Sequence, residues 1–205
     1  MTAIIDYNAG NIKSVENALE RLGCEYILTS DPAQIRTADR VILPGVGNAA
    51  EAMADLEAKG LVPVIKSLRR PVLGICVGMQ VLCRDSEEGN CRCMGVFDSH
   101  VVKFEASADA KVPHMGWNAI GNLDGKLFKG MKGGCNVYFV HSYYPTLCPD
   151  TVATCKHGST LFSAALKYEN FYGTQFHPEK SGDAGEMILR NFIISSPYDR
   201  DNSRN

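Results

Sequence analysis

One stretch of the chain decides the fold, and it reads Pro71-Val72-Leu73-Gly74-Ile75-Cys76-Val77-Gly78-Met79-Gln80-Val81-Leu82. The short apolar run before Cys76 predicts a buried strand, and the apolar residues after it predict a helix. A strand that turns into a helix within two residues needs a strained backbone at the turn and very small neighbours. Gly74 and Gly78 are such neighbours, so Gly-x-Cys-x-Gly is the thiol form of the Gly-x-Ser-x-Gly nucleophile elbow.

An elbow of this kind would hold the Cys76 sulfur clear of the sheet, at the start of a helix. Free N–H groups and the positive end of the helix dipole favour the thiolate there, and the thiolate is the attacking form. Cysteine is also one of the most buried residue types, so Cys76 can equally be a core residue. The far end of the chain decides between these two interpretations.

Length and composition are those of an ordinary globular protein. The chain has 205 residues, 45% hydrophobic and 21% charged, with a net charge of -2. We expect a single domain over residues 1–195 and a flexible tail over residues 196–205. There is no Lys/Arg run to suggest nucleic acid, and no apolar stretch near the ~20 residues of a membrane span. The N-terminus lacks a signal-peptide pattern, so a cytoplasmic location is expected.

The cysteines point to a reducing compartment. There are 8 of them, scattered among apolar segments of a chain of good size, which favours free thiols over disulfides. Cys83, Cys91 and Cys93 form the one local cluster. Its spacing matches no common zinc pattern and it contains no histidine, so we expect neither a metal nor a cofactor.

The first half of the chain alternates between strand and helix patterns. Apolar strands are expected near residues 3–6, 25–28 and 40–43, and helical spacing runs from residue 12 to a stop at Gly23. This order predicts an α/β fold with an open, largely parallel sheet and helices on both faces.

The pattern changes to short alternating segments after residue 95. Segments 96–97, 100–104 and 117–120 predict antiparallel strands added at an edge, and 151–155 with 162–167 predict a hairpin. The remaining expectations are a solvated loop at 84–90, a loop at 111–118 that serves as a lid or partner surface, a strand from 171 that closes the sheet, and a final helix at 184–194.

The loop Pro44-Gly45-Val46-Gly47-Asn48 follows the third strand. Sites in open parallel sheets form beyond the carboxyl ends of the strands, where Cys76 also lies. A glycine loop can direct backbone N–H groups at an oxyanion, although it can also be a plain turn. A phosphate loop is not indicated, because no Gly-Lys-Ser/Thr follows.

A base for the cysteine is found in His177-Pro178-Glu179. In an extended segment, residues two apart point the same way, and Pro178 keeps the residue before it extended. Glu179 can then accept a hydrogen bond from one nitrogen of His177 and leave the other free as the base. His114 and His141 are the competing histidines, and a lone loop histidine such as His114 is more often structural.

With neither a metal pattern nor a dinucleotide loop, covalent acyl transfer is the natural reaction class. The oxyanion donors would be the N–H of Val77 and one from residues 45–47. Gln80 lies one turn beyond Cys76 on the same helix face, where it can bind a substrate amide or simply pack.

The segment 74–80 together with His177-Pro178-Glu179 resembles the class I, triad-type glutamine amidotransferases. The resemblance implies a flavodoxin-like fold and a glutaminase. Cys76 would attack the side-chain amide of glutamine, His177 would protonate the departing ammonia, and water would then release glutamate.

The resemblance covers residues 3–194. Three segments, at 6–15, 43–47 and 113–118, are most similar to the glutaminase subunits of imidazole glycerol phosphate synthase. This similarity implies a heterodimer with a separate cyclase, which is a (β/α)8 barrel. The cyclase uses the ammonia with a phosphoribosylformimino carboxamide ribonucleotide (PRFAR). The products are imidazole glycerol phosphate and an aminoimidazole carboxamide ribotide (AICAR), in histidine biosynthesis.

The same resemblance implies roles for further residues. The oxyanion donors are Gly47 and Val77, and the substrate-binding residues are Gly45, Gln80, Ser142 and Tyr143. The family must reposition the loop at 44–47 for activity. Two departures from the family pattern, Val77 and the pair Asn48-Ala49, remove no reacting group.

Other functions stay open at this point. An amidotransferase for anthranilate, pyridoxal phosphate or nucleotide synthesis would share Cys76, His177 and Glu179, but segments 6–15 and 113–118 argue against it. A redox-sensing or chaperone-like protein, or a binding module, would carry the elbow without needing an oriented base. A cysteine peptidase would rest on the same three residues.

Overall fold

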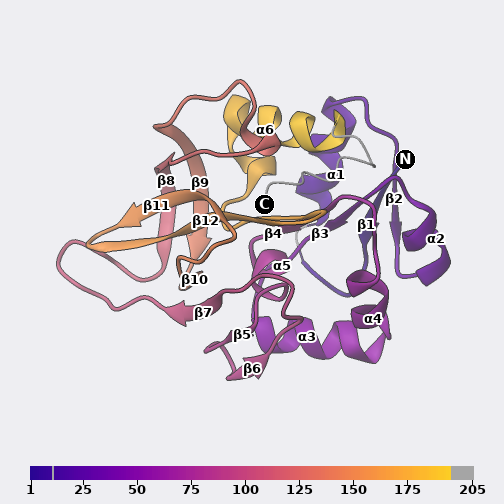
Figure 1. The fold of residues 1–205 in the computed structure, drawn as a ribbon, viewed down its shortest axis with the longest axis horizontal. Helices are drawn as coiled ribbons and strands as arrows, with labels where there is room; N and C mark the ends of the chain where they lie inside the picture. Colours follow the sequence, from indigo (N-terminus) through magenta and orange to yellow (C-terminus); the bar gives the residue numbers. More distant parts are fainter. Residues whose placement is uncertain (11, 195–205) are drawn as a thin grey trace.

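The computed structural model describes residues 1–10 and 12–194, and its centre is one nine-stranded sheet (Figure 1). Its strands, in sheet order, are β2 (Tyr26–Thr29), β1 (Thr2–Ile5), β3 (Arg40–Leu43), β4 (Val72–Ile75), β13 (Phe171–Thr174), β12 (Thr160–Tyr168), β11 (Thr151–His157), β8 (His114–Gly121) and β9 (Cys135–His141). The strands from β2 to β13 are parallel, and those from β12 to β9 are antiparallel. The predicted α/β fold, with a parallel core and an antiparallel addition, is confirmed.

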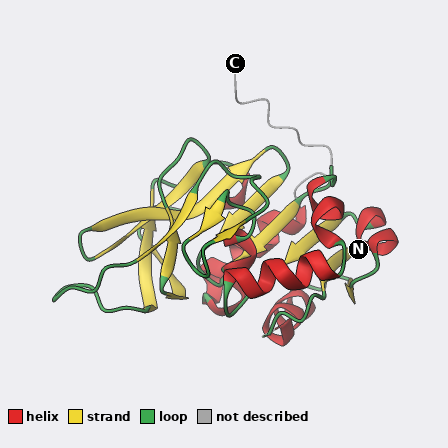
Figure 2. Ribbon diagram, turned by 90° about the horizontal axis from the view of Figure 1, so that it is seen from below, coloured by secondary structure: helices red, strands yellow, loops and turns green. Residues whose placement is uncertain are grey.

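Helices cover both faces of the parallel half (Figures 1 and 2). The helices α1 (Ile12–Arg21) and α6 (Gly182–Ile194) lie on one face, and α2 (Pro32–Thr37), α3 (Ala49–Ala58) and α4 (Leu61–Lys66) lie on the other. Strands β1, β4 and β13 are therefore buried along their whole length, as their continuous apolar sequences require. Within the described ranges, every helix is too short or too polar to cross a membrane.

The parallel order brings three chain segments to one edge of the sheet. Strands β3, β4 and β13 are neighbours, and their carboxyl ends lead into residues 44–48, Cys76 and His177 respectively. The site is thus placed by topology, before any side chain is considered.

A second sheet of four strands was not predicted. Its strands, in order, are β10 (Tyr143–Pro145), β7 (His100–Lys103), β5 (Asp85–Ser86) and β6 (Cys91–Arg92). The prediction of a solvated loop at 84–90 is wrong, because β5 falls within it and Ser86 is buried. A strand of two residues is too short to show an alternation of apolar and polar residues, so β5 and β6 could not be predicted from the sequence.

Other boundaries also differ from the predictions. Segment 96–97 is not a strand: the N–H groups of Val96 and Phe97 both donate to the carbonyl of Leu82. Strand β8 begins at His114, so half of the expected loop at 111–118 is strand. Strand β13 does not close the sheet but lies in its middle. The predicted tail at 196–205 lies outside the described residues.

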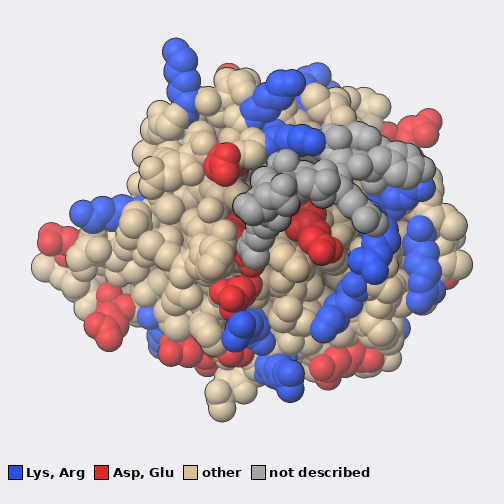
Figure 3. All heavy atoms as spheres, in the orientation of Figure 1, with Lys and Arg blue, Asp and Glu red and all other residues tan. Residues whose placement is uncertain are grey.

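Charges of both signs are interspersed over the face shown in Figure 3. This distribution agrees with the net charge of -2. It gives that face a mixed character and not the single-sign field of a polyanion-binding surface.

Candidate active site

Cys76 occupies the sharp turn between β4 and the helix α5 (Val77–Gln80), with φ 54° and ψ -112°. A positive φ is costly for a residue with a Cβ atom, by about 1–3 kcal/mol, and persists only where the surroundings enforce it. Here a Cβ on Gly74 would lie 2.6 Å from the Gly78 carbonyl oxygen, and a Cβ on Gly78 would collide with the Leu43 carbonyl. The elbow geometry expected from the sequence is present, although α5 is shorter than the helix predicted there.

His177 is fixed by its backbone and its ring. Its N–H donates to the Tyr138 carbonyl at 2.9 Å, and its own carbonyl accepts from the Ser181 hydroxyl at 2.6 Å. Its Nδ1 lies 2.8 Å from Glu179 Oε1, inside the protein. Glu179 belongs to a 3-10 turn, η2 (Pro178–Lys180), and not to an extended segment, yet the predicted contact forms.

The second ring nitrogen of His177, Nε2, has no such partner in the described part of the chain. Because Nδ1–H donates to Glu179, Nε2 carries the lone pair of the neutral ring. This Nε2 is buried and has no hydrogen-bond partner among the described residues. An unpartnered buried nitrogen on the wall of a cavity is suited to exchange a proton with a bound substrate or nucleophile.

The pKa of His177 reflects a competition. Burial lowers it, but the neighbouring Cys76 and Glu179 side chains outweigh burial and raise the pKa to about 10. The ring is therefore held as the imidazolium beside the sulfur.

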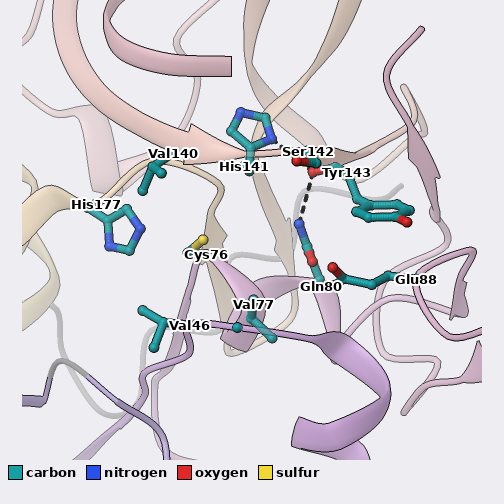
Figure 4. A pocket seen from close by; sticks show the side chains of 11 residues that line it. Val46, Cys76, Val77, Gln80, Glu88, Val140, His141, Ser142, Tyr143 and His177 are labelled. Atoms are coloured by element: carbon teal, nitrogen blue, oxygen red, sulfur yellow. Dashed lines mark hydrogen bonds between the residues drawn. The ribbon is translucent and has the colours of Figure 1, made fainter. Parts of the chain in front are cut away.

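A cavity of about 170 Å³ opens beside the sulfur. It is similar in size to a cavity of ~150 Å³ that takes up benzene, so it suits a small molecule. Its lining residues are Val46, Gly47, Cys76, Val77, Gln80, Glu88, Val140, His141, Ser142, Tyr143 and His177. Figure 4 shows the Cys76 sulfur between the His177 ring on one side and the Gln80 amide on the other.

The loop at 44–48 forms part of this cavity. Gly47 lines it and has φ +90°, which the absence of a Cβ permits. The Tyr7 hydroxyl donates to the Pro44 carbonyl at 2.7 Å and so fixes the start of the loop. Gly45 is not among the lining residues, because it is buried against the backbone of Gly78.

The opposite side of the cavity is a network of amides. Gln80 Nε2 donates to the Tyr143 carbonyl and to Gln175 Oε1, both at 3.0 Å. Gln175 Nε2 in turn donates to Cys76 Sγ at 3.7 Å. With both of its neighbours fixed, the Gln80 side chain has one defined orientation, and its oxygen is left for other partners.

His141 lines the cavity but cannot serve as the base. Its Nδ1–H donates to the Tyr143 carbonyl at 2.8 Å, so its Nε2 must accept from His114 Nδ1 at 3.0 Å. Both nitrogens are occupied, and burial lowers its pKa to about 3. His114 packs against Phe139 and is buried, and burial lowers its pKa to about 4. The structure thus separates His177 from the two competing histidines.

Two residues of the site, Gln175 and Glu88, were not predicted from the sequence. Gln175 lies two residues before His177, and the period of an extended chain could have suggested that both face the same way. Glu88 lines the cavity from the turn between β5 and β6. No sequence signal marks Glu88, because it is one of three acidic residues in a polar stretch.

Known proteins resemble the chain over nearly its whole length. A sequence profile of the family described as "Glutamine amidotransferase class-I" matches residues 3–196. A protein of Bacteroides fragilis named "Imidazole glycerol phosphate synthase subunit HisH" is 54% identical over 192 residues, which are 93% of this chain and 97% of that protein. A protein of the same name from Shewanella loihica is 45% identical over 202 residues, 94% of this chain and 89% of that protein.

Solved structures repeat the fold at low sequence identity. A putative GMP synthase protein of Thermoplasma acidophilum superposes with a TM-score of 0.72 at 24% identity, over 94% of this chain and 91% of that chain. A glutamine amidotransferase of Thermotoga maritima gives a TM-score of 0.63 at 18% identity, over 94% and 81%.

Proposed function

The chain belongs to the class I glutamine amidotransferases and, within them, to the HisH glutaminase subunits of histidine biosynthesis, and on this premise we propose that Cys76, His177 and Glu179 form its catalytic triad. The observation that carries the proposal is the buried His177, bonded to Glu179 through one nitrogen and bare at the other, on the wall of the cavity that holds the Cys76 sulfur.

The proposed reaction has two halves. In the first, the Cys76 thiolate attacks the amide carbon of glutamine, and the imidazolium of His177 gives its Nε2 proton to the leaving ammonia. A thioester remains on the sulfur. In the second, Nε2 takes a proton from water while that water attacks the thioester, which releases glutamate and restores the thiolate. Glu179 holds the ring in one tautomer and stabilises its charged form throughout.

The developing oxyanion would be held by two backbone N–H groups. Val77 is the first residue of α5, so its N–H has no partner within the helix. Gly47, on the loop at 44–48, lines the same cavity as Val77. Gly45, which the family resemblance assigned to substrate, we assign instead to packing against the elbow.

The amide network and Glu88 would hold the other end of glutamine. Gln80 and the backbone at Ser142 and Tyr143 offer an oxygen and further polar groups to the substrate's amide and carboxylate. Glu88 is the one acidic side chain among the lining residues, so it suits the α-ammonium group.

The partner would be the cyclase of the synthase, a (β/α)8 barrel that receives the ammonia and converts PRFAR to imidazole glycerol phosphate and AICAR. We place it against Met115 and Trp117, which are 63% and 58% exposed although both are large and apolar. The Trp117 ring packs edge-on against Tyr138, whose carbonyl holds the His177 N–H. A partner bound at Trp117 would therefore be separated from the proposed base, His177, by Tyr138. The cysteines are free, which supports the proposed cytoplasmic location.

The deciding experiment is the release of glutamate from glutamine by the purified chain, alone and with the cyclase and its ribonucleotide. We expect little release by the chain alone and a large rise in the complex. Strong release by the chain alone would support the proposed glutaminase activity but contradict the expectation that the cyclase activates it. No release under either condition, with Cys76 still open to alkylation, would refute the proposed function.

A further inference from the structure

Glu88 is held in place more firmly than its position in an exposed turn suggests. Its N–H donates to the Ser86 hydroxyl at 3.1 Å, and its carbonyl accepts from the Cys91 thiol at 3.7 Å. The next residue, Gly89, has φ +74° and would press a Cβ against Ala50 at 2.5 Å. The turn between β5 and β6 therefore packs directly on the start of α3.

The carboxylate of Glu88 makes a contact away from the cavity as well. Its Oε2 accepts from the N–H of Ala49, the first residue of α3, at 2.9 Å. The Asn48 side chain accepts from the next two N–H groups, of Ala50 and Glu51. The free N–H groups at this helix start are thus satisfied by two side chains, of which one belongs to a distant segment.

The helix start that Glu88 holds is also the end of the oxyanion loop. Gly47 lies two residues before Ala49 and one before the capping Asn48. At the other end of the loop, the Tyr7 hydroxyl holds the Pro44 carbonyl. The loop is therefore fixed at both ends, by Tyr7 on one side and by Glu88 on the other.

We propose that Glu88 is a positioning residue for the oxyanion loop: the carboxylate that lines the substrate cavity also fixes the start of α3, and so links glutamine binding to the placement of the Gly47 N–H. This inference rests on the proposed glutaminase function. One oxygen is bonded to Ala49, and the other remains for an ammonium group. An ammonium that orders this side chain also orders its bond to α3, so each contact favours the other.

Two substitutions separate the two contacts. Glu88→Gln keeps a side-chain oxygen that can accept from the Ala49 N–H but loses the negative charge. We expect KM for glutamine to rise by about 10-fold or more, with kcat in the cyclase complex changed by less than about 2-fold. Glu88→Ala loses both contacts, and we expect the same rise in KM together with a further fall in kcat of about 10-fold.

The matched control is Glu87→Ala. Glu87 is exposed, and its carboxylate also accepts a backbone N–H, from Lys103 at 2.7 Å, but it does not line the cavity. We expect KM and kcat of this variant to equal those of the unsubstituted chain. A similar loss in Glu87→Ala would mean that the small sheet has been disturbed as a whole, and would overturn the proposal.

Amide hydrogen exchange gives a readout that does not depend on activity. The Ala49 amide should stay protected in Glu88→Gln and exchange at least about 10-fold faster in Glu88→Ala. Equal kcat in the two Glu88 variants, or equal protection of Ala49, would refute the link to the loop. Absence of glutaminase in the unsubstituted complex would instead refute the proposed function, while the exchange data would still report on the contact between Glu88 and Ala49.

Discussion

The two sides of the cavity are built in different ways (Figure 4). The reacting side lies at the ends of the neighbouring parallel strands β4 and β13, and its recognisable features are local: the elbow at Cys76 and the contact between His177 and Glu179. The recognition side, with Gln80, Glu88 and Tyr143, depends on contacts between segments far apart in the chain. Both sides are held by neighbouring strands, but the reacting groups carry local sequence motifs, whereas the recognition groups are brought together only by the packing of separate elements.

The strongest test of this contrast is Cys76→Ala. It removes the proposed nucleophile and the contact from Gln175 to the sulfur, but leaves the bonds from Gln80 to Tyr143 and from Ala49 to Glu88 in place. Glutaminase should therefore fall by at least about 10⁴-fold while glutamine still binds. Glutamate release and, separately, glutamine binding by calorimetry would be measured in the cyclase complex. Glutaminase at the unsubstituted rate would end the proposed mechanism.

A second test ranks the members of the reacting side. His177→Ala removes the base and should cost about 10⁴-fold in kcat, whereas Glu179→Gln removes only its orienting charge and should cost about 10²-fold. Glutamine KM should change little in either variant. Equal losses in kcat would contradict the division of roles between base and orienting group.

A third, smaller effect is expected from Gln80→Leu on the recognition side. The substitution removes the donor to Tyr143 and Gln175, so the buried Gln175 Oε1 loses its partner, while the Tyr143 carbonyl keeps the bond from His141. We expect KM to rise by about 10-fold, kcat to fall less, and the free energy of unfolding to drop by about 1–3 kcal/mol. Steady-state kinetics and urea unfolding measure these effects. A fall in kcat alone would assign Gln80 to the reacting side.

The smallest expected effect is a difference in titration between the two sides. The pKa of His177 is raised from 6.5 to about 10, and that of His141 is lowered from 6.5 to about 3. The stability that His177 contributes is complete below pH 6.5 and is lost as pH rises toward 10. The stability that His141 contributes is present above pH 6.5 and is lost as pH falls toward 3.

Ring signals in NMR would check both directions. Between pH 5 and 8, His141 should remain neutral and His177 charged, so neither signal should move by more than about a tenth of its full range. Titration of His141 near pH 6.5 would contradict its two fixed hydrogen bonds.

The contrast between the two sides also explains what could be predicted. Cys76, His177 and Glu179 are identifiable from short motifs, because the elbow and the His-Pro-Glu contact are set by adjacent residues. The parallel strands are predictable from their apolar runs, and with them the edge of the sheet where the site lies. That edge brings the two motifs together, although they are about a hundred residues apart.

The position of Glu88 and the tautomer of His141 could not be predicted in the same way. Glu88 reaches the cavity through a sheet whose strands β5 and β6 have two residues each, too few to show a pattern. The His141 ring is oriented by His114, which lies on a strand where the sequence pattern predicts a loop. Each of these contacts depends on which strands pair, and pairing is a property of the whole sheet.

The strained backbone at Cys76 has a consequence for the evolution of related chains. With φ 54° and ψ -112°, this position would be relaxed by glycine, which lacks the Cβ that makes the turn costly. Stability alone would therefore favour three glycines in the elbow, at 74, 76 and 78. On the proposed mechanism, selection for catalysis is what keeps a sulfur there. A descendant that has lost its reaction but kept its partner would drift toward glycine at this position, so Gly-x-Gly-x-Gly in an otherwise intact chain marks a pseudoenzyme.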